Sequence, residues 1–389
     1  MRFIAFLLLF YSFIFGYDEK TELQIQGVTY NNYTNELLAT GDVKLRFESD
    51  VVTTNIDLSF FYSSTYQERR YALIKELYLS KEFDTYSIHI GKEIQFWGEL
   101  EGYNIADVYN QKNYLQDPFD KSSKYGTWGG NIIRYFDENS LGFGLKVYEA
   151  DIELPQDETP FAPLAFKYDE KLQLSDSRYS PTLYIIGSVV SEDFLESEAK
   201  LIFLHGYDTK RYFIPKTATT LSQYAYRVNK ALFLAHSIYN DTIFKTELGY
   251  TDIINDTKMS DYTQLSFGVE KSIYDLFGSD ITLYGEYYRY IYHNENTIKN
   301  VDISEVYDND LFLAFMLNCN DIRNSTFKAG LLYDLTKTEH IAKVTFKSRL
   351  IDSFMLSLEY LLITAKTKNS ILYQFNDTNR VNLSLLYTF

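Results

Sequence analysis

The chain has 389 residues, with 37 Lys and Arg against 53 Asp and Glu, so its formal charge at pH 7 is −16. Because phosphate binding depends on Lys and Arg, this acidity argues against a nucleic-acid partner. The single cysteine excludes a disulfide framework and a zinc site built from cysteines. Aromatic residues reach 17%, with 36 Tyr and 29 Phe, a composition that favours β-strands and opposes disorder.

The N-terminus has the pattern of an export signal. A start that includes Arg2 is followed by 13 uncharged residues, and the run closes at the small residue Gly16. This combination is typical of a secretory signal peptide. The alternative, a membrane anchor, would need about 20 apolar residues. We therefore predict Sec-type export, with a signal peptide over residues 1–16 and a single domain over residues 17–389.

Apolar and polar residues alternate along most of the remaining chain. In the last segment Leu383 and Leu385 flank Ser384, and the alternation continues to Phe389. A period of two sends successive side chains to opposite faces of a sheet. Such segments number about 18, each of roughly 9–12 residues, which suits tilted strands of a membrane barrel, although 16 strands also fit. The predicted strands are 21–29, 38–48, 52–63, 71–81, 85–95, 127–136, 140–149, 181–191, 195–205, 228–239, 241–252, 261–272, 280–292, 310–319, 325–335, 340–350, 353–364 and 379–389.

The connections between these strands alternate between short turns and long loops. We expect the long loops at about 97–126, 150–180, 206–227 and 293–309. One end of the sheet then carries tight turns and the other carries long loops, as in outer-membrane barrels, with both termini at the short-turn end. The pattern predicts an all-β fold, a transmembrane antiparallel up-and-down β-barrel with extracellular loops. A secreted β-sandwich or β-helix is the alternative, but one-sided loops are rare in sandwiches and no fixed repeat period is present.

Two stretches carry a resemblance to a known family. The first is the alternating C-terminal strand that ends on Phe389. The second contains, in order, Gly91, Lys92, Phe96, Trp97, Gly98, Asn104, Asp107, Val108, Asn110, Asp117, Pro118 and Asp120. The first resembles the terminal strand of Gram-negative outer-membrane porins, and the second is similar to a family of long-looped porin-like barrels. The resemblance implies residence in the outer membrane, recognition of the terminal strand by the barrel-assembly machinery, and transport of an unspecified solute.

If the apolar residues of each strand face lipid, the residues between them line the lumen. The charged residues that we assign to the pore wall on this basis are Lys328, Lys343, Lys347, Arg349, Glu359, Glu247, Glu270 and Glu286. Two interpretations stay open. These charges simply avoid lipid, or the basic members form a row opposite carboxylates whose field selects passing solutes.

The predicted loop 97–126 is too long for a turn, and loops of about 30 residues tend to be functional. We predict that it folds inward and narrows the lumen. The residues that we assign to this constricting loop are Trp97, Asn104, Asp107, Asn110 and Asp117. Asp107 and Asn110 are expected to hydrogen-bond the barrel wall, with Asp117 near the constriction. The alternative is an exposed loop whose Asp and Asn residues serve turns.

The other expected partners follow from charge and from the membrane. The loop 150–180 carries a net charge of −4. Acidic loops of this kind either are plainly solvated or contact lipopolysaccharide phosphates through divalent cations. We expect outer-membrane lipid and lipopolysaccharide to surround the protein, and small hydrophilic solutes to pass through it.

No enzymatic motif is visible. No two of the five histidines occur at the spacing of metal ligands, and no nucleophile elbow or phosphate-binding glycine loop is present. We therefore expect no catalytic residues, no metal site and no cofactor. The sequence predicts a porin for passive diffusion of small hydrophilic solutes. The alternatives are a non-conducting surface protein, such as an adhesin or assembly partner, and a barrel hydrolase that assembles its site from distant strands.

Overall fold

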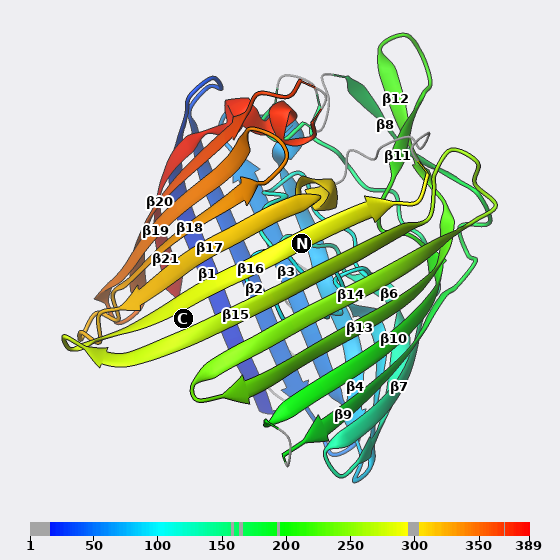
Figure 1. The fold of residues 1–389 in the computed structure, drawn as a ribbon, viewed down its shortest axis with the longest axis horizontal. Helices are drawn as coiled ribbons and strands as arrows, with labels where there is room; N and C mark the ends of the chain where they lie inside the picture. Colours follow the sequence, from blue (N-terminus) through cyan, green and yellow to red (C-terminus); the bar gives the residue numbers. More distant parts are fainter. Residues whose placement is uncertain (1–15, 157–158, 163–165, 193–194, 295–302, 369) are drawn as a thin grey trace.

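The computed structural model describes residues 16–389 apart from 157–158, 163–165, 193–194, 295–302 and 369. Within these residues, 18 strands form one antiparallel sheet that closes on itself (Figure 1), which confirms the predicted barrel and its strand number. The barrel strands are β1 (Gly16–Tyr30), β2 (Glu36–Glu48), β3 (Thr53–Ser63), β4 (Tyr71–Glu82), β5 (Tyr86–Glu93), β6 (Thr127–Phe136), β7 (Asn139–Lys146), β9 (Thr182–Ser191), β10 (Ser197–Tyr207), β13 (Arg227–Tyr239), β14 (Thr242–Ile254), β15 (Tyr262–Leu276), β16 (Ser279–Tyr292), β17 (Asn309–Asn318), β18 (Thr326–Asp334), β19 (Glu339–Ile351), β20 (Phe354–Ala365) and β21 (Arg380–Thr388).

Closure joins the first strand to the last. β1 and β21 are antiparallel neighbours, with Glu22 opposite Thr388 and Tyr30 opposite Arg380. All remaining pairs in the barrel join strands that follow one another in the chain, with β9 following β7 because β8 lies outside the barrel. A closed sheet has no exposed edge, so its backbone groups are paired within the barrel.

The connections differ in length between the two ends of the barrel. At one end only two residues separate β6 from β7, β13 from β14, and β19 from β20. At the other end the long connections span 94–126, 147–181, 208–226 and 293–308, within three residues of the predicted loops. β1 begins and β21 ends at the short-connection end. Gly16 opens β1, and the rest of the predicted signal peptide, residues 1–15, lies outside the described residues.

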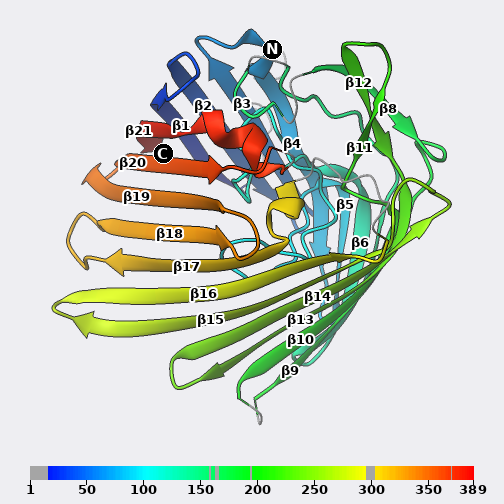
Figure 2. The ribbon, with the colours of Figure 1, turned by 45° about the horizontal axis from the view of Figure 1, so that its top comes forward.

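The long connections contain strands that were predicted only as loops. β8 (Lys167–Leu174), β11 (Tyr212–Pro215) and β12 (Thr220–Ala225) form a separate sheet at the long-connection end (Figures 1 and 2). β12 is antiparallel to β11 and parallel to β8. β11 and β12, with four and six residues, show too few alternations to be recognised by period. The same end carries the short 3₁₀-helices η1 (Gln67–Arg69), η2 (Ile303–Val306) and η3 (Leu372–Thr378).

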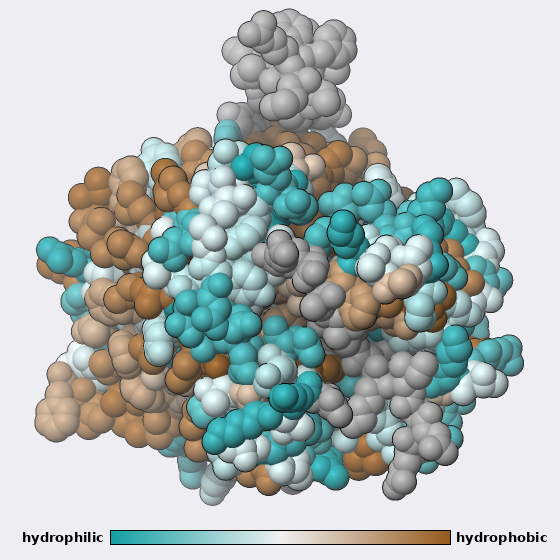
Figure 3. Space-filling model, turned by 90° about the horizontal axis from the view of Figure 1, so that it is seen from above, coloured by the Kyte–Doolittle hydropathy of each residue, from teal (hydrophilic) through white to brown (hydrophobic). Residues whose placement is uncertain are grey.

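The alternation separates an apolar outer face from a packed interior. On β14, Leu248 and Tyr250 point outward and are 40% and 45% exposed, whereas Glu247 points inward and is fully buried. Seen from the long-connection end, apolar side chains lie along one flank and polar side chains cover much of the top (Figure 3). None of the helices in the described residues has the length and apolarity to cross a membrane. Buried apolar residues lie inside the barrel and, around Tyr168, Leu172 and Leu221, at the separate sheet of the long-connection end.

Candidate functional site

The connection between β5 and β6, residues 94–126, folds into the barrel, and we call it the interior segment (cyan within the ring of strands in Figure 2). Its first half is held by inward carboxylates on the wall. The Glu247 carboxylate on β14 accepts the backbone N–H of Glu99 at 2.7 Å and that of Ala106 at 3.1 Å. One wall carboxylate thus fixes two points of the segment.

A second carboxylate repeats this arrangement two strands away. Glu286 on β16 accepts the backbone N–H of Glu101 at 2.6 Å and that of Gly102 at 2.8 Å. The hydroxyl of Tyr288 donates to Glu286 and accepts the N–H of Tyr103 at 2.9 Å. A Cβ at Gly102 would come within 2.8 Å of that hydroxyl and 3.0 Å of the carboxylate, so glycine permits this close approach.

Gly98 and Asn104, which belong to the motif noted in the sequence, contact each other within the interior segment. The Oδ1 atom of Asn104 accepts the N–H of Leu100 at 2.8 Å, which closes a turn in the interior segment. A Cβ at Gly98 would overlap the Asn104 side chain. The glycine therefore makes room for the asparagine, and both serve the fold of the segment itself.

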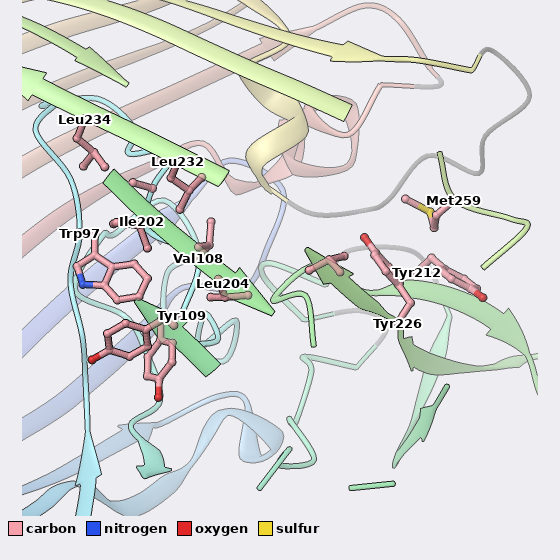
Figure 4. Close-up of a cluster of buried hydrophobic side chains, with 13 residues drawn as sticks. Trp97, Val108, Tyr109, Ile202, Leu204, Tyr212, Tyr226, Leu232, Leu234 and Met259 are labelled. Carbon is pink, nitrogen blue, oxygen red and sulfur yellow. The ribbon is translucent and has the colours of Figure 1, made fainter. Parts of the chain in front are cut away.

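An apolar cluster fills the side of the lumen next to β9, β10 and β13. Trp97 packs on Tyr109 and on Tyr184 of β9, with ring centres 5.6 and 4.9 Å apart. The interior segment's Trp97, Val108 and Tyr109 lie in one cluster with Ile202, Leu204, Leu232 and Leu234 from the wall (Figure 4). Each of these side chains is at most 8% exposed, so this side of the lumen is closed.

Tyrosines and lysines extend this filled side. The Nζ atom of Lys210 lies 4.2 and 3.9 Å from the ring centres of Tyr262 and Tyr290. Asp208, in the connection after β10, is fully buried and pairs with Lys230 at 3.1 Å. Burial acts to raise the pKa of the Asp208 carboxyl, but Lys230 and Lys210 outweigh it and hold that pKa below its usual range.

The second half of the interior segment is attached to other parts of the wall. Asp117 pairs with Arg380, the first residue of β21, at 2.6 Å. Arg69 of η1, which is 2% exposed, donates from Nε to the carbonyl of Leu115 at 3.0 Å and pairs with Glu36 of β2 at 2.5 Å. Sequence reasoning missed Arg69 because its partners lie 33 and 46 residues away and no local pattern marks them.

A cavity of about 610 Å³ remains on the other side of the lumen, between the interior segment and a wall formed mainly by β1 and β17–β21. We call it the lumen cavity. Its uncharged polar wall residues are Gln24, Gln26, Thr326, Thr345, Ser357, Asn382 and Ser384. Water and hydrophilic solutes therefore find hydrogen-bonding groups along this wall.

Charges of both signs line the lumen cavity. Lysines on β18 and β19 face carboxylates on the interior segment and on β20; these residues are Lys328, Lys343, Lys347, Glu101, Asp117, Asp120 and Glu359. Lys328 pairs with Glu101, and Lys343 pairs with Glu359 at 2.9 Å. In the described part of the chain no carboxylate lies within 4 Å of Lys347. Lys347 is therefore the lysine of this row that presents its ammonium group to the cavity without an acidic partner.

The predicted pore-wall residues divide into two groups. Lys328, Lys343, Lys347 and Glu359 line the lumen cavity, whereas Arg349, farther along β19, does not. The interior segment covers Glu247 and Glu286, so their prediction as pore-lining residues is corrected: they accept hydrogen bonds from backbone N–H groups of that segment. Glu270 is also absent from the cavity lining; it lies on β15, outside the wall that forms the cavity, and pairs with Lys245 of the neighbouring strand at 2.6 Å.

Of the two predicted wall contacts, one needs correction. Asp107 does not reach the wall but pairs with Lys124 at 2.5 Å inside the segment, where burial raises the pKa of Asp107 and lowers that of Lys124. Asn110 makes the predicted contact, because its side-chain amide donates to the carbonyl of Glu93 at the end of β5 at 3.2 Å, and it also accepts the N–H of Gln95 at 2.7 Å. A segment enclosed in a barrel must satisfy its own polar groups, and these two residues do so.

A closed 18-stranded barrel with one connection folded into its lumen is the class of structure that the geometry defines. No protein-family model matches the chain, and no curated protein matches it in sequence. Solved structures share the fold over almost the full length. A BenF-like porin from Pseudomonas fluorescens Pf-5 is 10% identical, with a TM-score of 0.59 over 96% of this chain and 98% of that one.

Two further structures give the same result. OccK2 (OpdF) from Pseudomonas aeruginosa, solved in complex with glucuronate, is 10% identical, with a TM-score of 0.57 over 96% of this chain and 97% of that one. OccAB1 from Acinetobacter baumannii is 8% identical, with a TM-score of 0.56 over 96% of both chains. At these identities the likeness concerns the fold. The shared fold agrees with the resemblance of the sequence to Gram-negative outer-membrane porins. The similarity of the Trp-Gly segment to long-looped porins stays a prediction.

Proposed function

We propose that this protein is an outer-membrane channel through which small hydrophilic solutes diffuse passively. The observation that carries the proposal is the lumen cavity, a space with charged and polar side chains in its lining, inside a closed barrel whose outer face is apolar. The fold shared with a BenF-like porin supports the same class. Residence in the outer membrane of a Gram-negative bacterium, contact with lipopolysaccharide, and insertion by the barrel-assembly machinery through the strand that ends at Phe389 belong to this proposal.

The mechanism needs no covalent step. The filled side of the lumen confines solutes to the lumen cavity, so the interior segment sets the width of the path. Lysines on β18 and β19 lie across from Glu101, Asp117 and Asp120 of the interior segment. Opposed charges create a transverse field that orients dipolar and charged solutes as they pass.

Planar-bilayer recording of the purified protein tests the channel. Steady single-channel current after insertion is the expected result, and sugar acids such as glucuronate are suitable trial solutes because a protein of the same fold binds one. Insertion without current would overturn the proposal and favour a non-conducting surface protein. Turnover of ester or peptide substrates would instead favour the hydrolase alternative.

Charge reversal tests the role of the basic row. In the double variant Lys343→Glu/Lys347→Glu, the reversal potential in a salt gradient should move toward that of a cation-selective pore, because two positive charges in the lumen become negative. The matched control is Lys366→Glu/Lys368→Glu, which changes the net charge equally at exposed positions in the connection after β20. An equal shift in both variants would mean that the overall charge, and not the lumen row, determines selectivity.

A further inference from the structure

A second cluster of charged side chains lies inside the barrel, away from the lumen cavity. It combines Glu99 of the interior segment, Glu198 of β10 and His236 of β13. The Nδ1 atom of His236 lies 3.1 Å from a carboxylate oxygen of Glu99 and 4.0 Å from one of Glu198. The side chains of these three residues are 13%, 24% and 25% exposed, so solvent reaches them.

These are ligand types that divalent transition metals accept. One potential ligand atom from each residue lies within 4.8 Å of the other two. Zinc bonds of about 2.0–2.2 Å to imidazole nitrogen and carboxylate oxygen place tetrahedral ligands roughly 3.3–3.6 Å apart. The His236–Glu99 separation of 3.1 Å is already near this value, and Glu198, at 4.0 Å, would move closer by about half an ångström. A site with three protein ligands leaves its fourth position for water.

A cationic group already occupies the space between the two carboxylates. The Nζ atom of Lys200 on β10 lies 3.0 Å from Glu99 and 3.1 Å from Glu198. Lys200 is 28% exposed, so its side chain can turn away from the two carboxylates toward solvent. A dication has twice the charge of the ammonium group and gains the imidazole nitrogen as an additional ligand.

Neighbouring groups hold the ligands in place. The hydroxyl of Ser188 donates to Glu198 at 2.7 Å, and the backbone N–H of Glu99 donates to Glu247 at 2.7 Å. Such outer contacts orient metal ligands and strengthen binding. We propose that Glu99, Glu198 and His236 form a binding site for a divalent transition-metal ion such as Zn²⁺, and that the ion displaces Lys200. Because Glu99 belongs to the interior segment and the other ligands to the wall, the bound ion ties the segment to the barrel.

This inference changes an expectation from the sequence. The spacing of the histidines gave no sign of a metal site, because the three ligands come from positions 99, 198 and 236 and meet only in the folded barrel. Metal binding is measured on the purified protein in detergent, so it succeeds or fails independently of the channel function proposed above.

Titration with ZnCl₂ against a competing chromophoric chelator tests the site. Wild-type protein should bind Zn²⁺, and His236→Ala and Glu198→Gln should each weaken that binding by at least the roughly 10–100-fold that loss of an outer contact costs. Lys200→Met should tighten it by about tenfold, because two partly exposed ion pairs no longer compete. Lys44→Met is the matched control, since it removes a lysine of β2 that pairs with Asp57 of β3, two strands that carry none of the three ligands, and Zn²⁺ binding should not change.

The gain expected from Lys200→Met keeps the test decisive even if a loss variant fails to fold. The proposal is overturned if wild-type protein binds no Zn²⁺, if His236→Ala and Glu198→Gln bind it as tightly as wild type, or if Lys200→Met behaves like Lys44→Met. Tighter binding in Lys200→Met together with weaker binding in His236→Ala supports it.

Discussion

The contact between Asp117 and Arg380 shows how a single ion pair fixes the interior segment to the wall. The Arg380 side chain is 6% exposed and has Asp117 at 2.6 Å and Glu359 at 3.7 Å. Asp117→Asn removes the nearer negative charge and leaves a buried guanidinium with the more distant partner. Since breaking a buried pair costs about 3–5 kcal/mol, and Glu359 compensates in part, we expect a loss at or below the lower end of that range. Chemical unfolding in detergent, followed by circular dichroism, measures it.

The same pair makes a prediction about pH. Burial acts to raise the pKa of Asp117, but Arg380 and Lys343 outweigh it, so the pKa in the folded protein lies below the usual value. A depressed pKa contributes stability above the unfolded pKa of about 3.9 and loses it as pH falls through the folded value. The stability difference between wild type and Asp117→Asn should therefore be constant near neutral pH and shrink below about pH 4. Asp120→Asn is the control, because within the described residues the Asp120 side chain bonds to nearby Ser122 and to no arginine or lysine. A difference at pH 3 as large as that at pH 7 would contradict the assignment.

At the scale of elements, Glu247 and Glu286 hold the first half of the interior segment. Glu→Gln at either position replaces a carboxylate that accepts backbone N–H groups with a neutral amide. Hydrogen bonds to charged groups contribute about 1.5–3 kcal/mol to stability, so we expect these contacts to weaken. Local opening of the segment should then become about 10- to 100-fold more frequent. Hydrogen–deuterium exchange of peptides that cover residues 99–106 measures this change.

Glu270→Gln is the matched control for the exchange experiment. Glu270 is another inward carboxylate, but its partner Lys245 belongs to the wall, so exchange over residues 99–106 should stay at the wild-type rate. Unchanged exchange in Glu247→Gln and Glu286→Gln would mean that the apolar cluster around Trp97 holds the segment without the carboxylates.

The whole barrel could be predicted from the sequence because each strand carries its own alternation. The direction of Lys343 and Lys347 follows from local period alone, and both line the lumen cavity. What Glu247 and Glu286 contact depends instead on a segment that lies 141 to 185 residues away in the chain. The alternation along a strand shows that a side chain points inward, but it does not show whether the side chain contacts water or another part of the chain. For the same reason the grouping of Glu99, Glu198 and His236 became visible only in the structure.

The outer face of the barrel gives a test of the membrane environment as a whole. Leu248 points outward from the middle of β14, whereas Tyr239 lies at the end of β13 beside a two-residue turn. If lipid hydrocarbon surrounds the barrel, Leu248→Lys places a charge near the midplane and should destabilise the folded protein by about 2–4 kcal/mol, against about 0–1 kcal/mol for Tyr239→Lys near the interface. Urea unfolding in phospholipid vesicles measures both values. Equal, small effects at the two depths would mean that water, and not hydrocarbon, surrounds the middle of the barrel, and the channel proposal would fail with it.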